Sequence, residues 1–358
     1  MFTVLNRFFM LGFIFTLLVF SSPVLAANLA QDAQVQKFIQ SMVSKHGFNK
    51  KELETLFAQV QLKQKILDAI SRPAEKSKPW HEYRKIFLKP KRIKQGARFW
   101  QDHNDVIDYA YQVYGVAPEI IVAIIGVETF YGRLQGNYRV MDALSTLGFK
   151  YPKRSKFFLG ELEHFLVMSR EQGFDPLSKN GSYAGAMGMG QFIPSSFQSY
   201  AVDFDGDGQK DIWSNKADAI GSVANYFKRH GWKKDQPVTD PVQLSNNTSL
   251  TPKEACKRSC KPKLTISEWK QQGVNGKLSA AGNSKAILLA LQQKTGMEYW
   301  LGYNNFYVIS RYNHSTLYSM AVYQLSQEIK QAYLTINSPT VNKAALNKAI
   351  SNKQTSGK

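Results

Sequence analysis

Cysteine is nearly absent from this sequence, and its scarcity argues against several kinds of site. Cys256 and Cys260 are the only two cysteines among 358 residues. In an oxidising compartment they are most simply interpreted as one local disulfide that closes a small loop. A metal pair is a weaker interpretation because no third or fourth Cys or His stands at ligand spacing, and catalysis by a thiol is weaker still.

Acidic residues are also few. The sequence has 27 Asp and Glu against 46 Lys and Arg, which gives a formal net charge of +19. The positive charge is densest between residues 72 and 98 and again after Asn342. Such a surface attracts polyanions, among them nucleic acid, anionic lipid and the bacterial cell-wall polymer. Any single Lys can equally be an ordinary solvated residue.

Long hydrophobic runs are missing after the first 26 residues. Arg7 precedes an apolar run of about 13 residues at 8–20, too short to span a bilayer comfortably. Small residues then precede Ala27, as at a signal-peptide cleavage site. We therefore predict a signal peptide at 1–26 and an exported protein that is soluble after cleavage, with no transmembrane anchor and no nucleic acid as partner. The residue directly after the cleavage site is Ala27 and not Cys, so lipid anchoring at a new N-terminal Cys is not supported.

Within the stretch 118–133, Glu128 is the only charged residue between Ile120 and Thr129, in a run of apolar residues. Pro118 is typical of a first helical position, and the residues that follow predict a helix that is apolar on nearly every face and therefore buried. Burial penalises the ionised form of Glu128 and raises its pKa, which favours a general acid. The alternative is a structural ion pair between Glu128 and Arg133 or Arg139.

A glycine-rich loop occupies residues 181–191. Small residues allow the backbone to approach a ligand closely. A phosphate-binding loop is disfavoured because the order is not G-x-G-x-x-G and no Lys-Ser/Thr pair follows. Two interpretations remain: a tight connection between helices, or a loop that lines a sugar groove with Ser182 and Gln191 as hydrogen-bonding groups.

An Asp-rich loop begins at residue 203 and matches the first half of an EF-hand. Position 12 is Ser214 rather than Glu, so Asp218 is the candidate for the closing ligand. An all-oxygen ligand set suits Ca²⁺ in a structural role. The alternative is an Asp/Gly turn without metal. The predicted metal ligands are Asp203, Asp205, Asp207, Gln209 and Asp218.

Periodicity predicts mostly helices. We expect three short helices within 32–69, one long helix at 91–114, further helices up to residue 230, and a closing helix at 315–335. Residues 237–283 lose helical periodicity and indicate a small β-containing part. We expect a helix at 284–295 and then a strand or hairpin at 299–309 that turns at Asn304 and Asn305.

Several of these motifs occur together in an order that resembles the lytic murein transglycosylase B family. The matching segments are Val127-Glu128-Thr129 with Tyr131-Gly132-Arg133, Tyr151-Pro152, the sequence SYAGAMGMGQFIP at 182–194, Ala201-Val202-Asp203-Phe204, and Arg311-Tyr312-Asn313. The resemblance covers roughly residues 38–331 and is most specific between 128 and 232.

The resemblance implies a mainly α (α+β) fold, with a lysozyme-like helical core, a flanking helical domain and a small β-containing subdomain. We expect an N-terminal helical domain at 27–114, a catalytic core with the EF-hand-like loop at 115–236, the β-containing subdomain or insertion at 237–310, a closing helical segment at 311–337 and a disordered tail at 338–358. It also implies a periplasmic location, peptidoglycan glycan strands as the partner, and possible membership of cell-wall synthesis or remodelling complexes.

The same resemblance implies the site. Glu128 matches the family's single catalytic acid. The residues that fall where the family binds its substrate are Tyr83, Lys153, Arg154, Ser182, Gln191, Phe192, Tyr226, Tyr312, Asn313 and Tyr318. Lys153 stands where the family has Arg, which weakens bidentate recognition of a carboxylate there.

The implied reaction is cleavage of the MurNAc–GlcNAc β-1,4 bond with formation of a 1,6-anhydro ring. Most glycosidases use two carboxylates, and no second acid in a similarly apolar setting is evident in this sequence. Three other hypotheses remain: a lysozyme-type muramidase that ends on water, a non-catalytic wall-binding or scaffold protein, and a nucleic-acid binder. Only a preference for particular DNA sequences would support the last, because a charge of +19 by itself attracts DNA.

Overall fold

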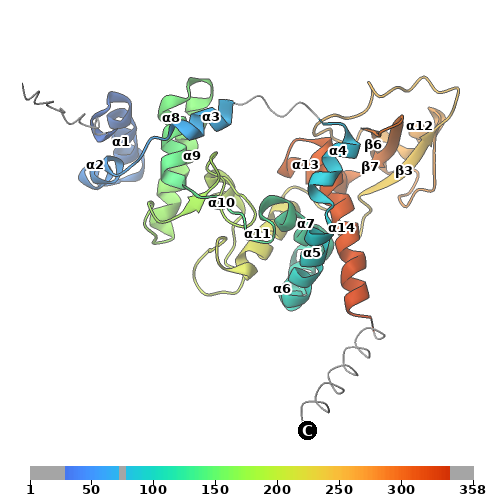
Figure 1. Cartoon of the computed structure of the whole chain (residues 1–358), viewed down its shortest axis with the longest axis horizontal. Coiled ribbons are helices and arrows are strands. Elements are labelled where there is room, and N and C mark those ends of the chain that lie inside the picture. Colours follow the sequence, from blue (N-terminus) through green and yellow to red (C-terminus); the bar gives the residue numbers. More distant parts are fainter. Residues whose placement is uncertain (1–28, 72–77, 339–358) are drawn as a thin grey trace, which may run out of the picture. The chain divides into compact units, whose positions relative to one another are not determined.

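The computed structural model describes residues 29–71 and 78–338, and it divides the chain into two compact units at residue 59. The predicted signal peptide and most of the predicted tail lie outside the described residues. Figure 1 shows the helices and strands in chain order. Among the described residues no single helix is long and apolar enough to cross a bilayer; α6 and α7, introduced below, meet that criterion only as a pair bent by 114°.

The first unit is a small group of helices: η1 (Leu29–Gln31), α1 (Ala33–His46) and α2 (Lys50–Ala58). Asp32 caps α1, and Asn49 caps α2 by accepting the N–H groups of Lys51 and Glu52. Gly47, at φ 64°, ends α1 in the left-handed conformation. The rings of Phe38 and Phe57 meet edge to face, with centroids 5.9 Å apart.

The second unit is built around α7 (Pro118–Thr129), and α5, α6, α11 and α14 pack against it (Figure 1). The bounds of its other helices up to α11 are α3 (Gln64–Ser71), α4 (Trp80–Phe87), α5 (Pro90–Asp102), α6 (Asn104–Tyr114), α8 (Val140–Lys150), η2 (Pro152–Arg154), α9 (Ser155–Glu171), α10 (Pro194–Tyr200) and α11 (Lys216–Arg229). Every residue from Glu119 to Gly126 is buried. A helix buried on all sides needs neighbours all round it, and these four supply them.

The predicted long helix at 91–114 is wrong in one respect. It is divided into α5 and α6 at His103, whose ψ of 27° is not helical. Asn104, the first residue of α6, accepts a hydrogen bond from the Tyr333 hydroxyl of α14 at 2.6 Å. Neither Pro nor Gly marks the break, so local sequence carries no signal for it. Gly115 ends α6, as predicted.

An antiparallel sheet forms the β-containing part, with strand order β4-β6-β7-β3-β5. A short pair, β1 (Tyr138–Arg139) and β2 (Asn180–Gly181), flanks the glycine-rich loop. The elements after α11 are β3 (Thr239–Leu244), β4 (Leu264–Thr265), α12 (Ile266–Gln271), β5 (Val274–Asn275), β6 (Lys285–Gln292), β7 (Met297–Gly302), α13 (Asn304–Tyr312) and α14 (Thr316–Ile336).

The predicted helix at 284–295 is wrong: the segment forms strand β6. Leu289 packs with Trp80 and Met320 on one face of the sheet, and Leu288 packs with Trp269 on the other. A strand buried on both faces shows no alternation in its sequence, so periodicity cannot distinguish it from a buried helix.

The predicted hairpin turn at Asn304 and Asn305 is also wrong, because these residues begin α13. The buried Asn305 side chain accepts the N–H of Lys233 and donates to the carbonyls of Lys233 and Gln236. Its amide therefore joins the sheet region to the end of the core. The predicted strand itself exists as β7, which ends before the two asparagines.

Candidate active site

Glu128 lies in the last turn of α7. The helix ends because Phe130 adopts φ 52°. The N–H of Phe130 bonds to the Gly126 carbonyl, and the N–H of Tyr131 bonds to the Ile125 carbonyl. This left-handed cap ends the helix one turn after the buried segment 119–126. Glu128 therefore lies at the edge of the apolar core, on the last turn of a helix whose preceding residues are buried.

The carboxyl group of Glu128 has an unusually high pKa. Burial raises the pKa from 4.5 to about 7, and a hydrogen bond from the Tyr318 hydroxyl to Oε1 opposes this rise. The residue still has some solvent-accessible surface. Among the described residues, no second carboxylate contributes to the shift. A proton is thus available at neutral pH on a group that a ligand can reach.

The alternative ion pair is not formed. Arg139 bonds to Asp142 instead, with Nε 2.8 Å from Oδ2. Arg133 is exposed, and within the described ranges it makes no ion pair with Glu128. The hydroxyl group of Tyr318, on α14, is the partner that the acid has.

Three predicted substrate-binding aromatics form one cluster beside the glycine-rich loop. The rings of Tyr226 and Tyr312 lie 4.7 Å apart, and that of Phe192 is 5.9 Å from Tyr226 and 6.2 Å from Tyr312. Tyr312 donates its hydroxyl hydrogen to the Gly190 carbonyl at 2.5 Å, and Tyr226 donates to the Arg311 carbonyl at 2.7 Å. Phe192 and Tyr226 are buried and Tyr312 is half-buried, so the cluster supports the loop as well as offering aromatic surface.

Hydrogen bonds within the glycine-rich loop and to α7 hold the loop in place. Ser182 Oγ accepts the N–H groups of Ala184 and Ala186, and Gln191 donates from Nε2 to the carbonyls of Gln135 and Gly188. Thr129, one residue after the acid, donates to the Met189 carbonyl at 2.8 Å. Thr129 was missed by sequence reasoning; a polar residue directly after the acid at a helix end was the available signal.

The remaining predicted substrate contacts lie nearer the surface. Tyr83 packs between Trp80 and Phe87 on α4. Burial and then Glu128 do most to raise the pKa of Tyr318, and Tyr83 adds to the same rise. Tyr83 therefore lies near the tyrosine that bonds to the acid. Lys153 and Arg154 are exposed on η2, and the Arg154 guanidinium lies 4.1 Å from the centre of the Phe157 ring. Asn313 is exposed directly after α13. Among the described residues, no contact links Lys153, Arg154 or Asn313 to Glu128.

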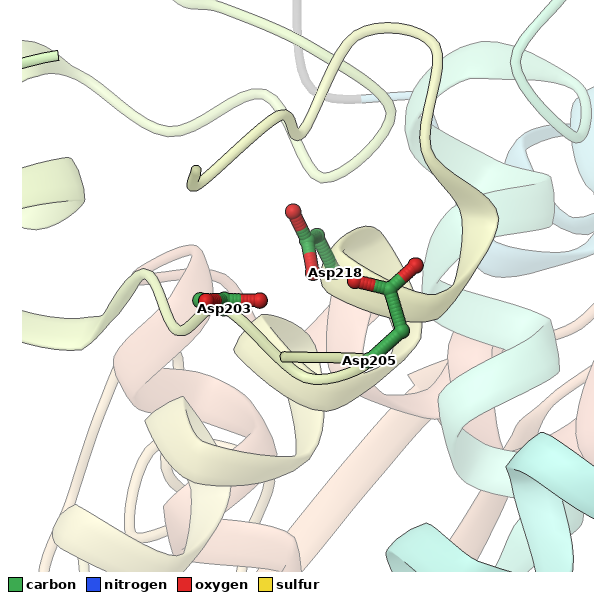
Figure 2. Close-up of side chains that lie close together, drawn as sticks. All are labelled: Asp203, Asp205 and Asp218. Atoms are coloured by element: carbon green, nitrogen blue, oxygen red, sulfur yellow. The ribbon is translucent and has the colours of Figure 1, made fainter. Parts of the chain in front are cut away.

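Three of the five predicted metal ligands converge. Asp203, Asp205 and Asp218 each place a carboxylate oxygen within 4.8 Å of the others (Figure 2). Asp218 is buried at the start of α11, and it accepts the N–H groups of Phe204 and Asp211 at 2.7 Å each. Its side chain therefore joins both ends of the Asp-rich loop. Three carboxylates at this separation fit a hard divalent cation.

The carboxylate of Asp207 is not in that group, and Gln209, which is predicted to offer its backbone carbonyl, stays a prediction. Asp207 is exposed, and its Oδ1 accepts the N–H of Gln209 at 2.8 Å. The structure adds Asp211, which sequence reasoning did not select. It accepts the N–H groups of Trp213 and Ser214 and so shapes the second half of the loop. Its place at the ninth position of the EF-hand pattern was the signal that could have identified it.

A cavity of about 660 Å³ lies at the other end of α7, where Glu119, Trp100 and Lys330 line it. Glu119 is buried there and pairs with Lys330 at 2.9 Å. This cavity does not include Glu128. The two acids of α7 therefore differ in kind, since one is neutralised by a cation and the other is kept protonated by its surroundings.

A helical core around one protonated carboxyl group, with a glycine-rich loop beside it, defines a lysozyme-like enzyme. Residues 30–327 match the family model described as Transglycosylase SLT domain. The chain belongs to this family of lytic transglycosylases.

Three relatives support that assignment. Membrane-bound lytic murein transglycosylase B of Escherichia coli (strain K12) is 44% identical over 317 residues, which cover 86% of each chain. The crystal structure of soluble lytic transglycosylase SltB1 from Pseudomonas aeruginosa is 50% identical, with a TM-score of 0.80 over 84% of this chain and 99% of that one. The structure of Escherichia coli Slt35 in complex with calcium is 43% identical, with a TM-score of 0.78 over 86% and 96%.

Proposed function

We propose that this protein cleaves peptidoglycan as a lytic transglycosylase, with Glu128 as its only acid and base. The observation that carries the assignment of Glu128 is its pKa of about 7, which keeps a protonated carboxyl group at the rim of the core near neutral pH. The family to which the chain belongs supplies the substrate class, the glycan strand of murein.

The reaction needs two proton transfers through one group. Protonated Glu128 gives its proton to the glycosidic oxygen as the bond to C1 of MurNAc breaks, and positive charge develops at C1. In place of a second carboxylate, the acetamido group of the substrate stabilises this charge. Ionised Glu128 then takes the proton from the C6 hydroxyl, whose oxygen bonds to C1 and closes the 1,6-anhydro ring. No water is consumed, and Glu128 ends protonated.

Tyr318 suits both halves of this cycle. Its hydroxyl donates to Oε1, and therefore holds the carboxyl group in one orientation and stabilises the carboxylate formed midway. We propose that Phe192, Tyr226 and Tyr312 bind sugar rings, and that Ser182 and Gln191 shape the loop that contacts them. Tyr83, Lys153, Arg154 and Asn313 complete the proposed substrate contacts at the surface.

Digestion of purified peptidoglycan with wild type and Glu128→Gln tests the assignment. We expect a loss of at least about 10²-fold in release of muropeptides, because general acid catalysis contributes at least that much. Mass spectrometry of wild-type products should show anhydro ends. Reducing ends without anhydro sugar would instead identify a lysozyme-type muramidase, and full activity of Glu128→Gln would leave a wall-binding protein as the better account.

The same variant carries its own folding control. The pKa of Glu128 is raised in the folded state, so its contribution to stability is present below pH 4.5 and is lost as the pH rises through about 7. At pH 8, Glu128→Gln should therefore unfold at the same temperature as wild type or a higher one. A lower unfolding temperature would show that lost activity reflects damage to the fold.

We also propose that the Asp-rich loop binds Ca²⁺ as a structural ion. A relative has been solved in complex with calcium, and Asp203, Asp205 and Asp218 converge here. Calcium at about 100 times its Kd should stabilise the fold by about 2.7 kcal/mol, and a chelator should reverse this. Thermal unfolding measures the shift. Asp205→Asn should remove the response to calcium, whereas Asp68→Asn, an exposed carboxylate on α3, should retain it. An unchanged wild-type curve would exclude the site.

The proposed location is the periplasm, after removal of residues 1–26. The Cys256–Cys260 disulfide is consistent with an oxidising compartment. Peptidoglycan strands are the proposed partner, and assemblies that build or remodel the wall are the places where such an activity would be used.

A further inference from the structure

The loop 253–263 of the β-containing part carries a concentration of unpaired positive charge. Its five cationic side chains are all exposed, and within the described residues none forms an ion pair. They are Lys253, Lys257, Arg258, Lys261 and Lys263. The only acid in the loop, Glu254, accepts the N–H of Thr251 at 2.8 Å and its hydroxyl at 2.5 Å. Glu254 is thus held by Thr251, and of the five loop cations only Lys253 acts on its pKa.

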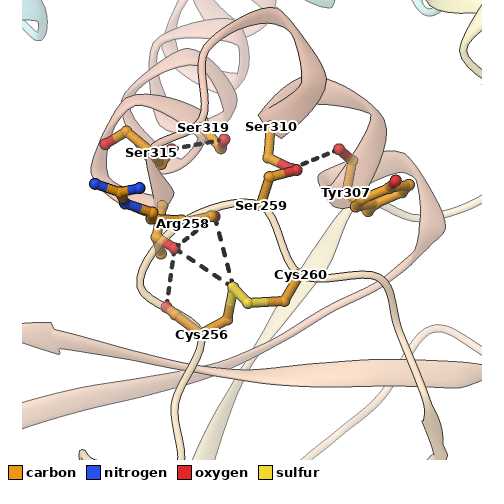
Figure 3. Close-up of a disulfide and its surroundings, with 9 residues drawn as sticks. Cys256, Arg258, Ser259, Cys260, Tyr307, Ser310, Ser315 and Ser319 are labelled. Carbon is orange, nitrogen blue, oxygen red and sulfur yellow. Dashed lines mark hydrogen bonds between the residues drawn. A yellow bond between two sulfur atoms is a disulfide. The ribbon is translucent and has the colours of Figure 1, made fainter.

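These charges stand on a rigid frame. The Cys256–Cys260 disulfide closes the loop, and the Cys256 N–H bonds to the Leu288 carbonyl of β6 at 2.8 Å. Thr316 Oγ1 donates to the carbonyls of Cys256 and Arg258, so the loop is tied to the first turn of α14. Figure 3 shows the disulfide with Arg258 and Ser259 of the loop. A preordered cationic site loses less conformational entropy on binding than mobile lysines do.

The cations surround a hollow. A cavity of about 700 Å³ is lined by all five of them and by apolar side chains that include Leu264 and Trp269. A second cavity of about 380 Å³ shares Lys253, Lys257 and Cys256 with the first and extends to Trp80, Thr316 and Leu317. The two cavities therefore adjoin each other, and both combine cationic and apolar lining residues.

The second cavity borders the helix that carries a proposed substrate contact. Trp80 of α4 lines it, and the Trp80 ring lies 6.4 Å from that of Tyr83. Both rings belong to one apolar cluster with Cys256 and Cys260 of the loop. A glycan strand that contacts Tyr83 would therefore pass beside the basic loop.

We propose that loop 253–263 is a second substrate site, which binds the carboxylates of a peptide stem on the strand being cleaved. The inference rests on the proposed function, since murein sugars are neutral apart from stems that carry several carboxylates. A concave site with an apolar floor fits a peptide better than it fits a flat lipid surface, and its position beside Trp80 and Tyr83 favours an anion that arrives with the substrate.

The test compares two matched triple variants. Lys253→Gln/Lys257→Gln/Arg258→Gln removes three charges from the loop, and Lys91→Gln/Lys94→Gln/Arg98→Gln removes the same residue types from the exposed side of α5. A free acidic stem tetrapeptide, titrated without any glycan, should bind wild type and the α5 variant alike and bind the loop variant about tenfold more weakly. The amidated tetrapeptide should bind all three weakly.

Kinetics give the second readout. On glycan strands with intact stems, KM of the loop variant should rise about tenfold, and on strands stripped of stems by an amidase it should equal that of wild type. Equal effects on both substrates, or equal tetrapeptide binding by the two triple variants, would overturn the proposal. So would loss of binding to anionic phospholipid vesicles with unchanged tetrapeptide binding, which would identify a membrane site. The tetrapeptide titration involves no cleavage, so it stays informative if the proposed reaction fails.

Discussion

At the scale of single residues, the decisive feature is that two carboxylates of one helix have opposite fates. Glu119 forms an ion pair with Lys330, whereas Glu128 meets a tyrosine hydroxyl in apolar surroundings. Desolvation dominates at Glu128, and one hydrogen bond only moderates it. Tyr318 therefore tunes the acid, and its removal should have a measurable signature.

Tyr318→Phe should raise the pKa of Glu128 further, because the lost hydrogen bond is the interaction that lowers it. Since Glu128 must be protonated to start the reaction, the alkaline limb of the pH–rate profile should move to higher pH. The rate at the optimum should fall about tenfold, as the carboxyl group loses its fixed orientation. Tyr312→Phe is the matched control, because that hydroxyl bonds to Gly190 and not to Glu128. A limb that moved equally in both variants would contradict this role.

At the scale of elements, α7 depends on close approach by its neighbours. A Cβ added at Gly126 would lie 2.6 Å from the Tyr131 hydroxyl, and one added at Gly96 of α5 would lie 2.5 Å from the same atom. The Tyr131 hydroxyl in turn donates to the Arg92 carbonyl at 2.9 Å. Glycine in the two helices therefore leaves room for one tyrosine that connects them next to the acid.

Gly126→Ala should destabilise the fold by about 1–3 kcal/mol, since overpacking outweighs the better helix propensity of Ala. Activity should also fall, because Glu128 lies in the following turn. Gly160→Ala on α9 is the control: nothing lies within 4 Å of its added Cβ, so it should be neutral or stabilise by up to about 1 kcal/mol. Denaturant unfolding measures both. Equal effects of the two variants would show that packing around Tyr131 does not constrain α7.

At the scale of the whole molecule, the net positive charge and the proposed export are both suited to the bacterial cell wall. A chain of net charge +19 is attracted to an anionic wall polymer, and the closed disulfide suits the compartment in which that polymer lies. Loop 253–263 adds exposed positive charge beside Tyr83, a proposed substrate contact.

Export itself can be tested on the mature protein. If residues 1–26 are a signal peptide, the protein recovered from the periplasm should begin at Ala27, and intact-mass measurement should show one disulfide. Replacing Ala26 with a bulky residue such as Trp should leave the leader uncleaved, whereas replacement of Gln31 should not. Recovery of a periplasmic wild-type chain that still carries residues 1–26 would contradict the prediction.

Sequence alone identified the catalytic candidate and most helices, because these depend on local patterns. Glu128 stands out as the one charge in an apolar run, and Pro118 marks the start of its helix through its fixed φ. It failed at β6, at the break beside His103 and at Asn305. In each case the outcome depends on partners distant in the sequence, which a local pattern does not contain.

The sequence by itself determined that one carboxyl group would be buried in a helix and that Asp203 and Asp205 would sit in a loop suited to a cation. Only the tertiary structure decided that Tyr318, 190 residues away, bonds to that carboxyl group, that Asp207 is not among the carboxylates that converge, and that the basic disulfide loop packs with Trp80 and Tyr83. Local chemistry selects the reactive groups, whereas the folding of distant segments onto one another sets the environment in which they react.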